Sequence, residues 1–467
     1  MPKAMFQQIL SFGCPTIGMV PVSDERIPMV NLANSFSPDA DLVFAVARLY
    51  SLLLYLALPF VLLRLAWRSR HAPVYRERWG ERLGLYDQRP LRAHIWIHAV
   101  SVGEVQAAEP LIEYFLARYP DAGVMVTTTT PTGSERLCSL FEGAVRHVYT
   151  PVDLTPVMNR FLDAVAPRLV VVMETEIWPN MISACERRGI PVVLANARLS
   201  ARSARGYARL GGFAGETLRR FAAIGAQSPT DAARLQALGV PAEQVQVTGN
   251  IKFDVRQPGS LIDHAEVLRR RWGVQRPVWV AASTHEGEEE QVLLAHRKIL
   301  DQLPGALLVL VPRHPERFGR VAALVKRRGF TLARRSASDP CSEQVSVFLG
   351  DTMGELPAFL AAGDVAFIGG SLVPTGGHNL LEAVVVGVPV AVGPHTFNFA
   401  WIAELMVREG AAVRVTDAHT LAQCMGEWLG DAATRARVGE RGRRVVQANQ
   451  GALQRLVDLL EEINKGD

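Results

Sequence analysis

The sequence lacks the short motifs that usually indicate a cofactor or a metal ion. Its 467 residues contain neither a GxGxxG stretch nor a Walker A motif, so dinucleotide-dependent and P-loop chemistry receive no support. Its five cysteines are scattered without a CxxC pair, and its 11 histidines form no HExxH motif. These absences argue against a zinc site or a disulfide framework and suit a reducing compartment. We therefore expect no cofactor and no metal.

The sequence also lacks an excess of either charge. Fifty Lys and Arg residues face 46 Asp and Glu residues, which leaves a net charge of +4. Such a balance gives no support to nucleic acid as a partner. There is no low-complexity segment and no repeat of short period. A chain of this length exceeds one ordinary hydrophobic core, so we expect two domains.

One long hydrophobic run is present near the N-terminus. Leu49–Leu63 carries no charge over 15 residues, and the run extends back to Leu42 across Arg48. A buried helix of the first domain would fit, but a membrane anchor over 41–70, either inserted or lying in the interface, fits better. The run starts too far from Met1 for a secretory signal peptide. The basic stretch that follows places the body of the protein on the cytoplasmic side. Residues 1–40 are expected to form a loosely ordered extension.

From Ala93 onward, short Val- and Ile-rich runs alternate with amphipathic stretches. This alternation predicts βα units and parallel sheets. It breaks near 250–275, where GNIKFDVRQPGS precedes a charged stretch, and a second set of runs begins at PVWVAAS. We expect two Rossmann-like domains facing a cleft, over 71–255 and 256–430. The remaining segment, 431–467, is expected to be helical and to pack back on the N-terminal domain.

The stretch WIHAVSVGEVQAAEPLI places a carboxylate where a strand turns into a helix. Two interpretations of Glu104 stand side by side. Ser101 and Glu104 have the spacing of a capping box, in which each side chain satisfies a backbone N–H of the helix start. Alternatively, Glu104 is a chemical group, because open α/β sheets bind ligands at this edge.

Three further segments of the first domain carry unusual polar residues. Thr127–Glu135 follows a strand and is either a polar ligand loop or an N-cap cluster. Glu174 and Glu176 follow the apolar RLVVVM run, where buried acids are costly unless partnered. Salt bridges to Arg198 and Arg202 would be the structural explanation for these acids. Lys252, in GNIKFD, lies at the expected linker.

The second domain offers residues suited to phosphate and ribose. Arg313 and His314 follow a strand in LVPRHPERF, and the arginine fork suits phosphate. GDTMGEL follows another strand. The glycine pairs in FIGGSLVPTGGHNLLE flank a helix expected from about His378, whose free N–H groups would form an anion site. Glu382, one turn in, would reach ribose hydroxyls.

Taken together, these segments resemble one family in order and spacing from about Leu49 to Asn398. HAVSVGEV, TTTTPTGSE, ETEIWPN, GNIKFD, PRHPERF, GDTMGEL and GGHNLLE are similar to the 3-deoxy-D-manno-octulosonic acid (Kdo) transferases of glycosyltransferase family 30. The departures are Leu380 and Ala383, where the family usually has proline, and a longer N-terminal extension.

The resemblance implies an α/β fold of the GT-B glycosyltransferase type and a single N-terminal membrane anchor. It implies transfer of Kdo from CMP-Kdo to the lipid A precursor at the cytoplasmic face of the inner membrane, without a metal. Glu104 would then be the general base, ionised at its helix start, while Glu174 and Lys252 would stabilise the transition state. The residues implied for CMP are Pro312, Arg313, Met353, Gly354, Glu355, Asn379, Leu380, Leu381 and Glu382.

Three other functions are compatible with the same GT-B fold. A membrane-associated GT-B transferase could use a UDP-sugar and a polyprenyl acceptor. A nucleotide-sugar epimerase would need no anchor. A membrane-attached binding protein without activity would not need Glu104, Lys252 and Arg313 together. The nucleotide that protects the protein from thermal unfolding, CMP or UDP, separates the first of these functions from Kdo transfer.

Overall fold

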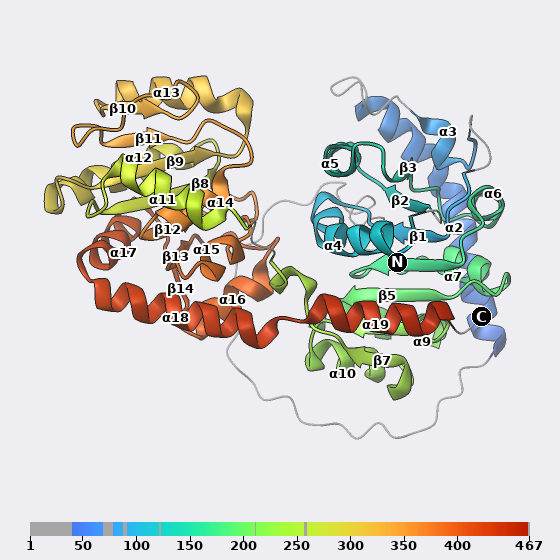
Figure 1. Cartoon of the computed structure of the whole chain (residues 1–467). Coiled ribbons are helices and arrows are strands. Elements are labelled where there is room, and N and C mark those ends of the chain that lie inside the picture. The colour runs from blue at the N-terminus through green and yellow to red at the C-terminus, as the bar shows by residue number, and fades with distance from the viewer. Residues whose placement is uncertain are drawn as a thin grey trace. The chain divides into compact units, whose positions relative to one another are not determined.

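A computed structural model describes residues 40–68, 78–86, 91–120, 123–210, 212–255 and 259–465. These residues form two compact units (Figure 1). The first unit runs to Ile251 and includes the chain from Gly451 to the C-terminus, and the second runs from Lys252 to Gln450. The extension expected over 1–40 lies outside the described residues, except for Ala40.

The first unit contains a seven-stranded parallel sheet in the order β3-β2-β1-β4-β5-β6-β7. Every residue of β1, β2, β4 and β5 is buried, which explains why these strands are continuous apolar runs rather than alternating ones. The strands are β1 (Ile95–His98), β2 (Val124–Thr128), β3 (Arg146–Tyr149), β4 (Leu169–Met173), β5 (Val192–Ala197), β6 (Ala223–Ala226) and β7 (Val245–Val247).

Helices cover both faces of this sheet. One core contains residues of α4, α5 and α19, and the other contains residues of α6, α7, α9 and α10. The helices are α2 (Ala40–Arg68), α3 (Trp79–Arg82), α4 (Val102–Arg118), α5 (Pro131–Phe141), α6 (Thr155–Val165), α7 (Pro179–Glu186), α8 (Ala201–Ala208), α9 (Gly212–Arg219), α10 (Pro229–Ala237) and α19 (Ala452–Lys465).

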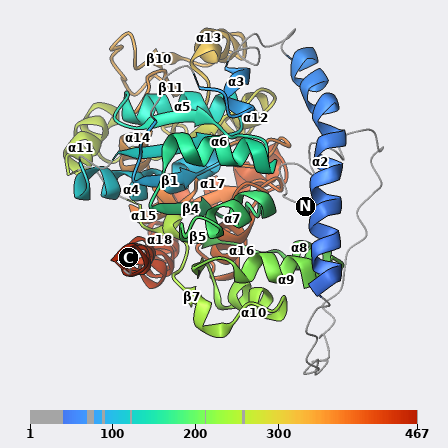
Figure 2. The same cartoon turned by 90° about the vertical axis from the view of Figure 1, so that its right-hand side faces the viewer.

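The apolar run near the N-terminus forms α2, a helix of 29 residues. Ala45–Trp67 is long and apolar enough to cross a membrane, and little of it is buried. Figure 2 shows α2 alongside the first unit, and α2 contacts α9 there.

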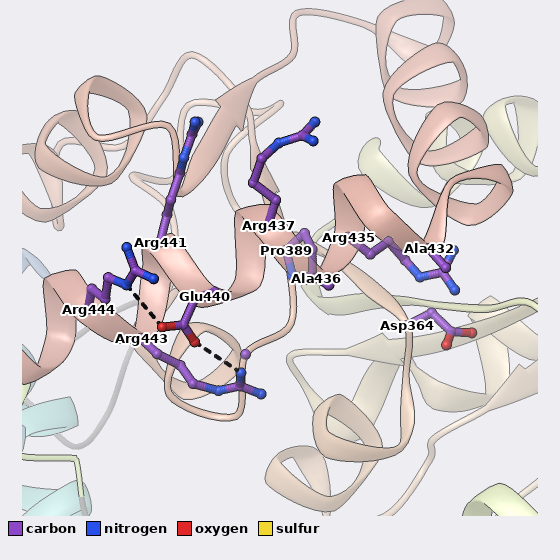
Figure 3. A pocket seen from close by; sticks show the side chains of 11 residues that line it. Asp364, Pro389, Ala432, Arg435, Ala436, Arg437, Glu440, Arg441, Arg443 and Arg444 are labelled. Carbon is purple, nitrogen blue, oxygen red and sulfur yellow. Dashed lines mark hydrogen bonds and ion pairs between the residues drawn. The ribbon is translucent and has the colours of Figure 1, made fainter.

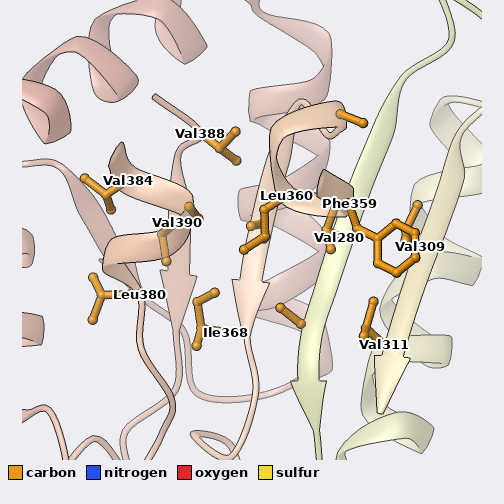
Figure 4. Packing of buried hydrophobic residues seen from close by; sticks show 14 of the residues in the cluster. Val280, Val309, Val311, Phe359, Leu360, Ile368, Leu380, Val384, Val388 and Val390 are labelled. Atoms are coloured by element: carbon orange, nitrogen blue, oxygen red, sulfur yellow. The ribbon is translucent and has the colours of Figure 1, made fainter. Parts of the chain in front are cut away.

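The second unit repeats the architecture with the strand order β10-β11-β9-β8-β12-β13-β14. All of its strand pairs are parallel. The strands are β8 (Val278–Thr284), β9 (Leu307–Pro312), β10 (Leu332–Arg334), β11 (Val347–Leu349), β12 (Val365–Ile368), β13 (Val390–Val392) and β14 (Ala412–Arg414). Figure 4 shows one face of this sheet, where Val280 and Val309 pack against Phe359 and Leu360 of α14.

The second unit is also covered on both faces. One core takes residues from α11, α14, α15 and α16, and the other takes residues from α12, α13 and α17. The helices are α11 (Leu261–Trp272), α12 (Glu288–Gln302), α13 (Phe318–Arg327), α14 (Leu356–Ala362), α15 (Leu381–Val385), α16 (Ala400–Arg408), α17 (Ala418–Gly430) and α18 (Ala432–Asn449). Among the described residues, the 3-10 turns are η2 (Ala242–Gln244) in the first unit, η3 (Ile251–Phe253) at the boundary of the units and η4 (Pro315–Arg317) in the second unit.

The expectation for 431–467 needs a correction, because the segment is divided between the units. Only α19 packs on the first sheet, where Leu456 and Leu460 are fully buried. Helix α18 stays with the second unit and packs on α15 and α17. Two glycines allow the close approach of α18. A Cβ on Gly439 would come within 2.1 Å of the Gly387 carbonyl oxygen, and one on Gly442 within 2.7 Å of Val384.

We predict that Gly439→Ala destabilises the second unit by about 2 kcal/mol, because the backbone of Gly387 cannot move as a flexible side chain would. Gly319→Ala in α13 is the matched control, since a Cβ there meets nothing within 4 Å. The control should be neutral or stabilising by up to about 1 kcal/mol. Denaturant unfolding of both variants measures the difference, and equal stabilities would refute the close-packing argument.

Candidate functional site

Three acids of the first unit meet at the edge of the sheet where the strand order reverses. Strand β1 pairs with β2 on one side and β4 on the other, so loops leaving β1 and β4 diverge at their carboxyl ends. Ligands bind at such a point in open parallel sheets. Glu104 follows β1, and Glu174 and Glu176 follow β4. The charges of Glu176 and Glu174 both act on the carboxyl of Glu104.

Glu104 makes the hydrogen bonds of a capping residue. Ser101 is the N-cap of α4 and accepts from the Glu104 N–H at 3.4 Å. Glu104 in turn accepts from the backbone N–H of Val100 at 2.8 Å and from the Ser101 hydroxyl at 3.1 Å. The reciprocal arrangement predicted from the sequence is therefore present, with the return bond to Val100 instead of the N-cap itself. These bonds fix the carboxyl in one position.

The electrostatic environment of Glu104 goes beyond capping. Burial, and then the charges of Glu176 and Glu174, raise the pKa of Glu104 well above 4.5. The bonds from Val100 and Ser101 act in the opposite direction but are outweighed. This corrects the expectation that the helix start alone would keep Glu104 ionised. A carboxyl with a raised pKa is a stronger proton acceptor once it is ionised.

The loop after β4 holds its two acids in different ways. Glu174 has a left-handed backbone with φ of 56°, which is unusual for a residue other than glycine. Glu176 is 4% exposed and accepts from the indole N–H of Trp178 at 2.9 Å. Burial, and then the charge of Glu176, raise the pKa of Tyr207 on α8. An aromatic pair thus flanks Glu176.

The hydroxyl-rich loop Thr127–Glu135 contains the N-cap of α5. Thr130 is the N-cap of α5 and accepts from the Gly133 N–H at 3.1 Å. The Thr127 hydroxyl lies within hydrogen-bonding distance of Trp96 and of His98 on β1. Burial lowers the pKa of His98 to about 3, so this imidazole is neutral. Its Nε2 is buried without a hydrogen-bond partner among the described residues.

A polar network anchors the GNIKFD segment in the first unit. Asn250 donates to Gln227 at 3.1 Å, and the Ile251 N–H donates to Asn196 at 3.2 Å. Lys252 is the first residue of the second unit. Its amine lies 5.7 Å from the ring centre of Phe399 there. The network fixes the backbone immediately before this lysine.

In the second unit the loops after β8, β9 and β12 bring three histidines together. His285 and His378 stack with ring centres 5.0 Å apart, and their Nε2 atoms are 2.8 Å apart. The His314 ring lies 5.3 Å from His285. Burial, followed by the charge of Arg313, lowers the pKa of His378 to about 3. The imidazoles of His285 and His378 are therefore neutral hydrogen-bonding groups beside a cation.

Arg313 follows β9, as the sequence predicted. Its N–H donates to the Thr284 carbonyl at 3.0 Å, which holds the loop after β9 against the end of β8. The side chain is partly exposed. No ion-pair partner for its guanidinium occurs among the described residues. Pro312, just before it, is the last residue of β9 and is buried.

Two glutamates that the sequence analysis did not single out build this region. Glu288, the first residue of α12, accepts from the N–H groups of Gly370, Ser371 and Leu372 at 2.6–3.0 Å. It also accepts from the His285 N–H at 2.9 Å. Glu289 pairs with both terminal nitrogens of Arg317 at 2.6 and 2.9 Å. The signal was present in the sequence as two acids in THEGEEE, directly after a buried strand.

The glycine-rich loop requires its glycines, but not for the predicted reason. Gly370, Gly376 and Gly377 have positive φ values of 67°, 103° and 73°. The N–H groups of Gly370 and Gly377 are used internally, by Glu288 and by the Gly370 carbonyl. The helix begins at Leu381, not at His378, and has only five residues. The predicted anion site of free N–H groups at a helix start is therefore wrong for these two glycines.

The remaining predicted CMP residues fall into two groups. Met353 is 65% exposed, Gly354 has φ of 82°, and Glu355 pairs with Arg335 at 2.7 Å. Burial would raise the pKa of Glu355, but hydrogen bonds from Arg335 and Thr352 outweigh it and lower the pKa.

The second group lies at the start of α15. Asn379 donates to Glu382 at 3.3 Å and accepts from the Leu381 N–H at 3.1 Å. The side chains of Leu380 and Leu381 are buried in the core, so only their backbone could meet a ligand.

Comparison with known proteins identifies the family. Residues 77–255 match the family described as 3-Deoxy-D-manno-octulosonic-acid transferase (kdotransferase). A 3-deoxy-D-manno-octulosonic acid transferase of Haemophilus influenzae is 43% identical over 88% of this chain and 97% of its own length. The chain belongs to the Kdo transferase family.

A second relative agrees with this assignment, and a solved structure agrees with the fold. A Bordetella pertussis protein of the same name is 40% identical over 82% of this chain and 90% of its own length. A UDP-GlcNAc 2-epimerase from Neisseria meningitidis shares the fold, with a TM-score of 0.52, over 78% of this chain and 99% of its own. This structural likeness supports the two-domain GT-B architecture. At 16% identity it says nothing about the reaction.

A pocket of about 860 Å³ in the second unit lies away from the residues predicted for CMP in this Kdo transferase. Its wall is largely α18. Figure 3 shows Arg443 and Arg444 turned toward Glu440, with which both pair. Arg435 donates to the carbonyls of Trp428 and Leu429 at 2.7 and 2.8 Å. Arg443 likewise donates to the carbonyl of Val386 at 3.1 Å. Arg435 and Arg443 thus serve the packing of α18 on α17 and α15, so we do not assign this pocket to the donor.

We predict that Glu288→Ala destabilises the second unit by about 3–5 kcal/mol, because four buried or half-buried N–H groups lose their acceptor. Glu286→Ala, two residues earlier on the exposed side, is the control and should cost less than about 0.5 kcal/mol. Chemical denaturation measures both. A Glu288 variant as stable as the control would show that the loop Gly370–Leu372 does not depend on this carboxylate.

Proposed function

We propose that this Kdo transferase moves Kdo from CMP-Kdo to the lipid A precursor lipid IVA, with inversion at the anomeric carbon. Glu104 is the general base. The observation that carries the proposal is the position of Glu104, buried beside two further acids at the switch point of the first sheet. Membership in the family supports the transferred sugar, and the resemblance of the motifs supports the donor and acceptor.

The chemistry needs one well-placed carboxylate. The acceptor hydroxyl attacks the anomeric carbon of Kdo and gives its proton to Glu104. The bond from that carbon to the phosphate oxygen of CMP breaks on the opposite face, and its electron pair leaves with CMP. No covalent sugar–enzyme intermediate forms. Since a general base works best with a pKa near the operating pH, the raised pKa of Glu104 suits the role.

Two further charged residues are proposed to support this step. The anomeric carbon gains positive charge as the bond to CMP breaks, and the negative charge of Glu174 would stabilise it. Lys252 would stabilise the negative charge that develops on the leaving phosphate. Glu174 also raises the pKa of Glu104, so the same acid has two effects.

The donor is proposed to bind to the second unit. Arg313 offers a guanidinium without an ion-pair partner among the described residues, next to the neutral pair His285 and His378. Pro312, Met353, Gly354 and Glu355 would complete the contacts to CMP. Asn379 to Glu382 would bind the ribose through Glu382 and the backbone of the two leucines.

The location follows from the acceptor and the apolar helix. We propose the cytoplasmic face of the inner membrane, with α2 as the attachment. The enzyme would meet its lipid acceptor in that leaflet.

We predict that Glu104→Gln lowers the transfer rate by at least about a hundredfold while leaving CMP affinity unchanged. It should also stabilise the protein at pH 8. Because the folded pKa of Glu104 is raised, wild-type stability is lost as pH rises through that pKa, whereas the variant cannot ionise there. The gain in melting temperature should therefore shrink toward pH 4. Normal turnover in the variant would show that Glu104 caps the helix and is not the general base.

We predict that Arg313→Ala weakens CMP binding by about tenfold or more, because a charged contact to phosphate is lost. The transfer rate at saturating donor should change much less. Arg320→Ala on exposed α13 is the control and should leave the affinity unchanged. Calorimetric titration with CMP measures the binding, and unchanged affinity would remove Arg313 from the phosphate site.

A further inference from the structure

Helix α2 is attached along one side to the body of the first unit. The hydroxyl of Tyr50 donates to Asp153 at 2.8 Å, and that of Ser51 donates to Asn180 at 3.1 Å. Leu54 is 2% exposed and packs with Leu154 and other residues of the body. The contacts extend along the helix from Val46 to Leu58. About 18 Å of the helix axis therefore lies against the protein.

The same attachment reaches the loop that carries the acids. Asp153 accepts not only from Tyr50 but also from the N–H groups of Asn180 and Met181, at 3.1 and 2.7 Å. These two residues belong to the first turn of α7, which directly follows the loop with Glu174 and Glu176. One buried carboxylate thus joins α2 to the end of that loop.

The opposite side of α2 is largely apolar and exposed, with Arg48 as an exposed charge on the helix. We call it the outer stripe, and its members recur every three or four residues, as one face of a helix does. They are Leu49, Leu52, Leu56, Phe60, Leu63 and Trp67, each more than half exposed.

We propose that α2 does not cross the membrane but lies in the plane of one leaflet, with the outer stripe among the acyl chains of an anionic phospholipid bilayer and its docked side on the enzyme. The membrane location of the proposed function is assumed here, but the proposed reaction is not. The lipid acceptor and the three acids would then share one leaflet surface.

Crossing the bilayer is disfavoured by what α2 would carry with it. Ala45–Trp67 is long enough to span a hydrocarbon core of about 30 Å. The docked part covers more than half of that length. A spanning α2 would draw α6 and α7 toward the hydrocarbon, with exposed charges at Arg160, Asp163, Arg187 and Arg188. Charged and irregular surfaces are not accommodated against lipid chains.

The neighbouring surface suits anionic headgroups. Helix α8 packs on α9, which in turn contacts α2. Its exposed side carries Arg202 and Arg205, and Arg209 follows at the helix end. Their spacing of three and four residues places them on one face. Such a basic face is attracted to the negative surface of the cytoplasmic leaflet.

The test is the side of the membrane on which the chain before α2 lies. Ser37→Cys introduces a thiol three residues before the helix, in a full-length chain that also carries Cys14→Ser and Cys341→Ser. Cys138, which is exposed on α5, reports on the body. A membrane-impermeant maleimide is applied to inside-out and right-side-out inner-membrane vesicles, and labelled peptides are quantified by mass against detergent-solubilised protein.

We expect the introduced thiol and Cys138 to be labelled together in inside-out vesicles, and neither in right-side-out vesicles. Labelling of the introduced thiol only in right-side-out vesicles would show that α2 spans the bilayer. Protection of that thiol in both preparations would also overturn the proposal, since the chain before an in-plane helix remains at the surface.

A second experiment tests the outer stripe itself. Leu56→Asp should weaken sedimentation with vesicles that contain one quarter anionic phospholipid by roughly tenfold or more. Leu294→Asp is the control and should have no effect, because Leu294 is also more than half exposed but lies on α12. Equal vesicle binding by both variants would overturn the proposal. It would also be overturned if the wild-type protein does not bind vesicles but forms a dimer that Leu56→Asp disrupts. If the introduced thiol and Cys138 are labelled on the same side but the protein transfers no Kdo, the result would count against the proposed reaction and not against the in-plane helix.

Discussion

Both candidate sites depend on a buried glutamate that accepts hydrogen bonds from the backbone, at the point where the first strand of a sheet leads into the next helix. Glu288 in the second unit receives four such bonds, and they hold the loop after β12 in place. Glu104 in the first unit receives one backbone N–H and one hydroxyl. Burial raises the pKa of both, but only Glu104 also faces two like charges. The same architectural position therefore serves structure in one unit and, in our proposal, proton transfer in the other.

In our proposal, the attachment of α2 connects this chemistry to the membrane. Asp153 is almost fully buried, and burial raises its pKa to about 6, although the hydrogen bonds it accepts act in the opposite direction. The Asp153 carboxylate accepts hydrogen bonds from the first N–H groups of α7 and from the Tyr50 hydroxyl at once. The loop with Glu174 and Glu176 is thus anchored at its end to the element that we propose touches lipid. An enzyme whose acceptor is a lipid gains from such a connection, since the acids remain near the headgroups.

Much of the fold could be predicted from the sequence, because buried parallel strands are continuous apolar runs. The position of Glu104 after β1 and of Arg313 after β9 followed from the same pattern. What could not be predicted depends on contacts between distant segments. Glu288 and Gly370 are 82 residues apart, so the glycine motif alone could not show that the Gly370 N–H donates to Glu288. The start of α15 at Leu381 and the docking of α18 on Gly387 also arise from packing. The competing interpretations of Glu104 were not exclusive, since capping bonds and a raised pKa coexist.

The most direct measurement is the mass of the product formed by purified full-length protein from freshly generated CMP-Kdo and the tetraacylated lipid A precursor. We expect a lipid heavier by one or more Kdo residues, formed together with free CMP. The number of residues added would follow from the same spectrum. An unchanged lipid, from protein that binds both CMP and vesicles, would contradict the proposed reaction and show that the donor sugar or the acceptor is a different one.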